Sequence, residues 1–121
     1  MKKSLLLAVL LFTVFTISYA QGGRQRTSPE ERAKRTTEWM KKELNLTQEQ
    51  VAQIDSINLD YAKAQQSLFD EANGDRSKIR EKMTALTKER DEAFSEVLTK
   101  EQMDLYKKKS SERRNNGRQR R

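Results

Sequence analysis

The sequence contains no cysteine and no histidine among its 121 residues, and both absences exclude several kinds of site. Disulfides, thiolate zinc sites and cysteine nucleophiles are impossible, and so are histidine general bases and histidine metal ligands. Glycine and proline are scarce as well, with four glycines and one proline. Because the turns of multi-stranded β folds need such residues, the composition favours helices. The fold must be held together by packing alone.

The first 20 residues have the layout of a secretory signal peptide. Two lysines form a basic start, an uncharged and mostly apolar run covers Leu5 to Ile17, and Ser18 and Ala20 are small residues suited to cleavage. The run is shorter than the roughly 20 apolar residues that span a bilayer comfortably. We therefore expect residues 1–20 to be cleaved, so that the mature chain begins near Gln21 outside the cytoplasm. The alternative is an uncleaved membrane anchor.

Positive charge is concentrated at the C-terminal end of the sequence. Removal of the first 20 residues leaves 23 basic against 18 acidic residues, a net charge of +5. From Lys107 onward there are eight basic residues and one acid, so the chain from Gln21 to Tyr106 carries −2. The loss of apolar residues predicts a disordered basic tail over residues 110–121. Such a tail is suited to anionic lipid or another polyanion, whereas the export signal argues against nucleic acid as a partner.

A Leu-Thr-x-x-Gln motif that occurs twice is the strongest pattern in the sequence. Its residues are Leu46, Thr47 and Gln50 in the first copy and Leu98, Thr99 and Gln102 in the second. In each copy the threonine can cap a helix while the glutamine reaches back to the threonine N–H, which completes a capping box. The leucine can pack on Val51 or Met103 as a hydrophobic staple. We expect these six residues to be structural, because capping and stapling occupy their side chains.

Helix start signals and apolar spacing predict a first helix from Pro29 to about Leu44. Ser28 is a good N-cap, proline suits the first helical position, and Glu31 can close a capping box. The apolar or near-apolar stripe consists of Ala33, Thr37, Met40 and Leu44, with Trp39 beside it. This stripe is weak, so the helix needs tertiary packing for its stability.

The second and third helices are predicted to form a long antiparallel hairpin, because only a few residues connect them. A helix from Gln48 to Asn73 would be about 39 Å long, and Gly74 would stop it. The third begins after Asp75 or Ser77. The predicted stripes are Val51, Ile54, Ile57, Tyr61, Ala64 and Leu68 in the second helix, and Ile79, Met83, Leu86, Ala93 with Phe94, and Val97 in the third, interrupted by Arg90.

A short fourth helix with Met103 and Tyr106 on one side completes an all-α fold of four helices. The helical domain would span residues 28–109, after a disordered lead-in at 21–27. Near the tip of the hairpin, acids are expected close to bases of the next helix: Asp70 and Glu71 near Arg76, Lys78 and Arg80. Two thin amphipathic helices and two short ones cannot surround a core. We therefore expect a homodimer whose apolar faces also remain partly open to clients.

The paired motifs in a small exported helical chain resemble the Spy/CpxP family of periplasmic stress proteins. The first match extends over residues 44–50, and the resemblance covers roughly residues 29–109. It implies a cradle-like dimer that acts as an ATP-independent chaperone, holding unfolded clients on a concave basic and apolar surface in the periplasm. A sister branch docks on the sensor domain of an envelope-stress kinase, and the sequence does not separate these two functions. Another branch binds zinc and carries histidines, which this sequence lacks.

The client surface has no fixed motif, so candidates come from residue type alone. They are Trp39, Met40, Lys41 and Lys42 on the first helix and Lys82 and Met83 on the third. Methionine and basic side chains adapt to varied partners. The alternative is that the methionines belong to the core and the lysines to an ordinary solvated face.

Catalysis, a cofactor and a metal site are not expected. The carboxylates alternate with lysine and arginine, as on any solvated helix, and nothing groups a nucleophile, a base and an oxyanion donor. Carboxylates alone would suit calcium, but the acidic stretch at residues 70–75 lacks the spacing and closing glutamate of an EF-hand loop. The sequence therefore predicts a binding protein rather than an enzyme.

Overall fold

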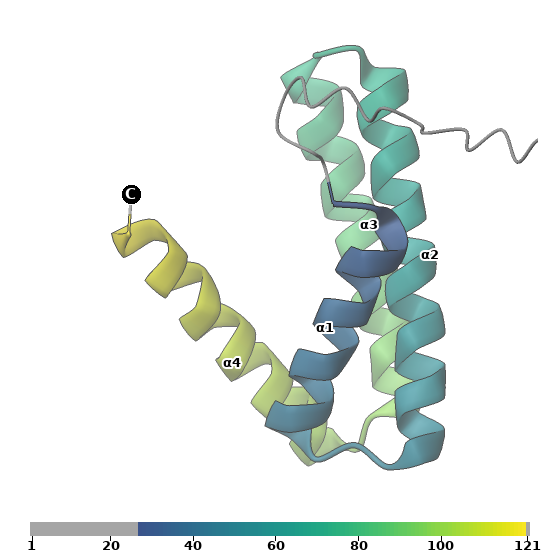
Figure 1. The fold of residues 1–121 in the computed structure, drawn as a ribbon. Coiled ribbons are helices and arrows are strands. Elements are labelled where there is room, and N and C mark those ends of the chain that lie inside the picture. Colours follow the sequence, from purple (N-terminus) through teal and green to yellow (C-terminus); the bar gives the residue numbers. More distant parts are fainter. Residues whose placement is uncertain (1–26, 121) are drawn as a thin grey trace, which may run out of the picture.

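A computed structural model describes residues 27–120, which form four α-helices and no strand (Figure 1). The helices are α1 (Pro29–Leu44), α2 (Gln48–Ala72), α3 (Arg76–Val97) and α4 (Lys100–Gln119). The predicted all-α fold is confirmed. The predicted signal peptide and residues 21–26 of the lead-in lie outside the described range. Within that range, no helix combines the length and the apolar character needed to cross a membrane.

Helix α1 begins and buries its side chains largely as the sequence predicts. The Ser28 hydroxyl accepts a hydrogen bond of 3.2 Å from the Glu31 backbone N–H. The Glu31 carboxylate pairs with Arg35 at 2.8 Å, and among the described contacts it does not close the predicted capping box. The four residues of the stripe are all buried, namely Ala33, Thr37, Met40 and Leu44. Asn45 ends the helix in the left-handed conformation, with φ 53°.

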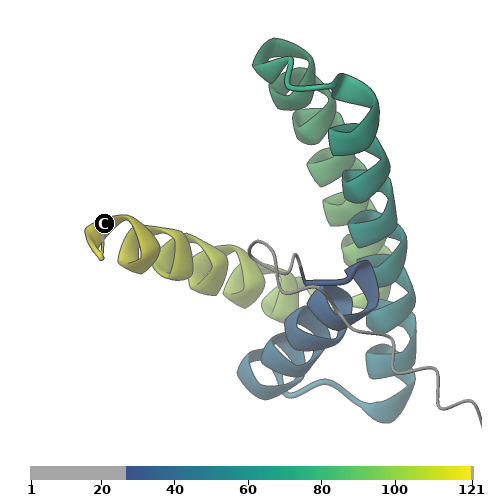
Figure 2. The same cartoon turned by 45° about the horizontal axis from the view of Figure 1, so that its top comes forward.

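Helices α2 and α3 run side by side as an antiparallel hairpin (Figures 1 and 2). Asn73 and Gly74 turn the chain with positive φ values of 47° and 86°. Asp75 caps α3, because its carboxylate accepts hydrogen bonds from the N–H groups of Ser77 and Lys78. The hairpin and its turn were therefore predicted correctly from local signals.

The charge pairs expected near the hairpin tip are not formed. Among the described residues, neither Asp70 nor Glu71 has an ion pair with a base at the start of α3. Both carboxylates are exposed to solvent. An exposed pair gains at most about 1 kcal/mol, which is easily offset by the entropy of two free side chains.

Helix α2 buries Ile54 and Leu68 of the predicted stripe and also a second face beside it, against which α1 packs. Asn58 and Ala62 are buried, whereas Ile57 and Tyr61 are only half-buried. The Asn58 amide donates a hydrogen bond of 3.0 Å to the Thr37 hydroxyl on α1. Helix α2 therefore has two contact faces, one toward α1 and one toward α3.

The main core lies at one end of the molecule, where residues of all four helices meet. It consists of Met40, Leu44, Leu46, Ile54, Phe94, Leu98 and Tyr106. Phe94 is the only buried side chain of α3, and its ring meets Tyr106 edge-on, with centroids 5.2 Å apart. The rest of the predicted α3 stripe is half-buried, because among the described helices no further one covers this face of α3.

Helix α4 continues to Gln119, so the predictions of a short fourth helix and of disorder from residue 110 are wrong. Contacts with α1 support the extension. The Arg113 guanidinium lies 5.0 Å from the centre of the Trp39 ring, and Lys109 Nζ lies 3.7 Å from a Glu43 carboxylate oxygen. Residues 111–120 are exposed, and this half of α4 diverges from the hairpin (Figures 1 and 2).

We expect Phe94→Ala to lower the free energy of unfolding by about 3–5 kcal/mol, because it removes a fully buried ring. Phe69→Ala is the matched control, since this ring is 40% exposed and its loss should cost less than about 1 kcal/mol. Urea unfolding followed by circular dichroism measures both changes. Equal losses would contradict the placement of the core at the base of the hairpin.

Candidate functional site

The two Leu-Thr-x-x-Gln motifs come together in space, and their glutamines bind each other. The Gln50 amide donates to the Gln102 side-chain oxygen at 2.7 Å, and the Gln102 amide donates back at 3.1 Å. Gln50 also donates to the Val97 carbonyl at 3.2 Å, and Gln102 to the Leu44 carbonyl at 3.3 Å. Each motif thus binds the carbonyl at the end of the helix that precedes the other motif.

Both predicted capping boxes are present. The Thr47 and Thr99 hydroxyls accept hydrogen bonds from the N–H groups of the two glutamines, whose side chains accept from the threonine N–H groups. Leu46 and Leu98 are buried in the core. The polar and apolar groups of the motifs are thereby occupied within the fold, and they hold four helix ends at one place.

The sequence-derived client candidates are scattered over the structure. Met40 is fully buried and its sulfur lies 3.7 Å from the Asn58 amide, so its assignment to an exposed client surface is wrong. Trp39 is half-buried in a crevice between α1 and α4. The lysines Lys41, Lys42 and Lys82 are exposed and Met83 is half-buried. The burial of Met40 agrees with its place in the predicted apolar stripe, and therefore with the alternative interpretation that this methionine belongs to the core.

An apolar groove runs between α2 and α3. Two adjoining hollows of about 250 and 350 Å³ share the lining residues Ala64, Leu86 and Glu89. The apolar lining comprises Ile57, Tyr61, Ala64, Leu68, Ala85, Leu86 and Ala93. At 100° per residue, these α2 positions lie about 110° around the helix from Asn58 and Ala62, so the groove occupies the face next to the one that packs on α1. All of this apolar lining except Ala85 belongs to the predicted stripes of the second and third helices, whose apolar faces were expected to stay partly open.

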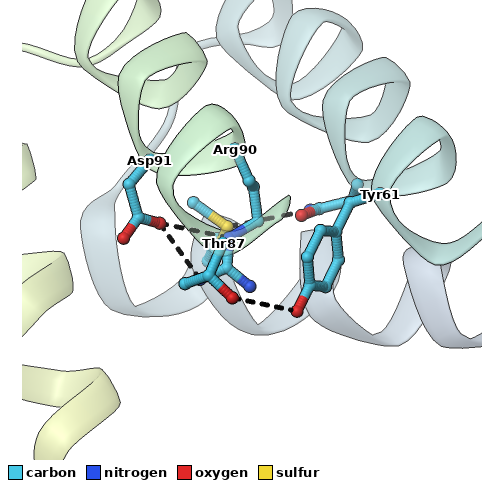
Figure 3. Close-up of polar contacts among 6 residues, drawn as sticks. Tyr61, Thr87, Arg90 and Asp91 are labelled. Atoms are coloured by element: carbon cyan, nitrogen blue, oxygen red, sulfur yellow. Dashed lines mark hydrogen bonds and ion pairs between the residues drawn. The ribbon is translucent and has the colours of Figure 1, made fainter. Parts of the chain in front are cut away.

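Arg90, which interrupts the predicted α3 stripe, lies in the wall of this groove (Figure 3). Its guanidinium is 4.5 Å from the centre of the Tyr61 ring and 5.6 Å from that of Phe94. It also pairs with the Asp91 carboxylate at 3.0 Å, and the Arg90 side chain is only 19% exposed. Stacking on two rings explains how an arginine replaces an apolar residue here.

The rim of the groove is acidic, although the resemblance implied a basic surface. The lining includes the carboxylates of Asp60, Glu71 and Glu89, while Lys82 is the one base in it besides Arg90. The strongly basic segment lies elsewhere, on α4. The apolar groove and the basic surface are thus two separate features.

Two further observations concern the chemistry of the described residues. Burial raises the pKa of the Tyr106 phenol, so this hydroxyl is a neutral core group at neutral pH. Residues 27–120 contain no cluster of three acidic, histidine or cysteine side chains that could hold a metal ion. The open groove is therefore the main candidate site.

A double-mutant cycle tests the contact between the motifs. We expect Gln50→Ala and Gln102→Ala each to cost about 1–3 kcal/mol, because each leaves partly buried partners without a hydrogen bond. The double variant should cost less than the sum by at least about 0.5 kcal/mol. Gln53→Ala, on the exposed side of α2, is the control and should change the unfolding free energy by no more than about 0.5 kcal/mol. Strict additivity in urea unfolding would show that the two amides do not interact.

The comparisons with known proteins identify one family. Its model, described as a domain of unknown function (DUF4890), matches residues 20–106. The match ends at Tyr106, so the basic part of α4 lies beyond it. No curated protein and no solved structure matches the chain. Because the family model covers well over half of the sequence, the chain belongs to the DUF4890 family.

Proposed function

We propose that the protein is a periplasmic, ATP-independent chaperone of the Spy/CpxP type. It would hold unfolded or misfolded envelope proteins and prevent their aggregation. The observation that carries this proposal is the open apolar groove along α2 and α3. The signal-peptide pattern supports the proposed location in the periplasm, and the two Leu-Thr-x-x-Gln motifs support the proposed relation to the Spy/CpxP family.

The groove has the properties that a binder of varied chains needs. It is shallow, is lined by apolar side chains with charged residues among them, and extends over several turns of both helices. Contiguous exposed apolar surface marks interaction sites, because its burial against a partner is favourable. A shallow groove also imposes little shape selection, so segments of different sequence can occupy it.

The fold keeps this surface formed in advance. The motif contacts fix one end of the hairpin, and α1 supports the adjacent face of α2 through Asn58 and Ala62. A preformed surface loses little entropy on binding, which favours affinity. Reversible burial requires no nucleotide, in keeping with a holdase. A homodimer would place two such grooves in one particle and is part of the proposal.

A second candidate function is regulation, in which the protein docks on the periplasmic sensor domain of an envelope-stress kinase. The observation that favours it is the exposed basic half of α4, which diverges from the body (Figure 2). An acidic partner surface would attract such a helix. The same segment would serve contact with anionic lipid or another polyanion.

Light scattering tests the chaperone proposal. Residues 21–121, which contain the whole described fold, are mixed without ATP with each of two unrelated, chemically unfolding clients. We expect suppression of aggregation near one dimer per client. Ala64→Gln, which places a larger polar side chain where the two hollows meet, should raise the amount required about tenfold, equivalent to about 1.4 kcal/mol.

Ala52→Gln is the matched control, because Ala52 is exposed on the same helix. It should leave the suppression unchanged. If the unaltered protein fails to suppress aggregation of either client at about a tenfold molar excess, the chaperone proposal is wrong.

A further inference from the structure

We infer that the α2–α3 groove selects apolar client segments flanked by lysine or arginine. The inference rests on the proposed function, since it names the class of client segment for the same groove. It also departs from the basic client surface expected from the sequence. The charges around the groove, rather than those of the whole chain, lead to this conclusion.

The effective charge of the groove is negative. Arg90 pairs with Asp91 at 3.0 Å and stacks on Tyr61, so its charge is already neutralised within the fold. The remaining charged side chains of the lining are one base and three acids: Lys82, Asp60, Glu71 and Glu89. These three carboxylates are exposed, and none forms an ion pair with another described residue. The three carboxylates are therefore available to the lysine or arginine side chains of a bound segment.

The positions of the carboxylates define a spacing for the ligand. Asp60 and Glu71 are eleven residues apart on α2, which places them on one side of the helix about 16 Å apart along its axis. Between them the apolar lining of α2 is Tyr61, Ala64 and Leu68. An extended segment covers this distance in about five residues. Two basic residues about five positions apart, with apolar residues between them, therefore match the groove.

Helix α4 of a second copy of this chain is a poorer occupant. Its basic side chains would satisfy the charges, but from Lys107 onward it offers no apolar side chain to cover the lining. An unfolded polypeptide supplies both kinds of group in one segment. The groove chemistry therefore favours a client over the tail of a partner subunit.

Three labelled peptides test the inference by fluorescence anisotropy. They share one apolar centre and carry, five positions apart, two lysines, two glutamines or two glutamates. We expect the lysine peptide to bind tightest and the glutamate peptide weakest, with about a tenfold difference at low ionic strength. The difference should shrink as salt rises, because exposed charges are screened.

Matched variants separate the groove from the overall charge of the protein. The variant Asp60→Asn/Glu71→Gln/Glu89→Gln should bind the three peptides nearly equally. The control Glu38→Gln/Glu81→Gln/Asp104→Asn changes the net charge by the same amount at exposed positions outside the groove lining, and should keep the preference. A preference that survives in the groove variant would overturn the inference.

The remaining outcomes distinguish a failure of this inference from a failure of the chaperone proposal on which it rests. Equal binding of all three peptides, or tighter binding of the glutamate peptide, overturns the inference and leaves the chaperone proposal standing. If no peptide binds and aggregation is not suppressed, the chaperone proposal itself fails. Sedimentation velocity tests whether a second copy of the chain occupies the groove instead. If the groove variant converts a dimer to monomers, and no peptide competes with dimer formation, then a second copy fills the groove. That result would overturn the inference.

Discussion

The side-chain amides of Gln50 and Gln102 bind each other, and the arrangement of the four helices depends on this contact. Each glutamine completes the cap of its own helix and also binds the end of a helix from the other half of the chain. The ends of α1 and α3 and the beginnings of α2 and α4 are thereby held at one place. We call this meeting point of four helix ends the junction. Because a partly buried amide without hydrogen-bond partners is costly, the two glutamines strongly favour this one arrangement of the helix ends.

Fixing the helices at one end leaves the rest of the hairpin open. The core cluster lies at the junction, with Ile54 and Phe94 fully buried. Toward the tip, α1 covers one face of α2, and the neighbouring face forms, together with α3, the apolar groove with its acidic rim. The core and the open groove thus occupy different parts of the same two helices. The basic half of α4 is a third region, which the junction orients away from the hairpin (Figure 1).

The parts of the fold that the sequence predicted are those that local contacts determine. The caps at Ser28, Thr47 and Thr99, and the turn at Gly74, involve residues close together in the chain. The missed features depend on contacts between distant residues. Gln50 and Gln102 are 52 positions apart, and α4 is extended by stacking of Arg113 on Trp39 of another helix. The apolar lining of the groove lies largely on the predicted stripes, but the face of α2 that α1 covers was not predicted, because it depends on contacts between distant residues.

Amide hydrogen exchange followed by NMR tests the role of the junction most directly. Protection should be highest around Ile54 and Phe94 and should fall toward Gly74 and along α4 beyond residue 110, because opening proceeds from the less packed ends. The side-chain amide protons of Gln50 and Gln102 should exchange more slowly than those of exposed Gln53. Uniform protection along the hairpin, with all three side-chain amides exchanging alike, would contradict a fold held together at the two motifs.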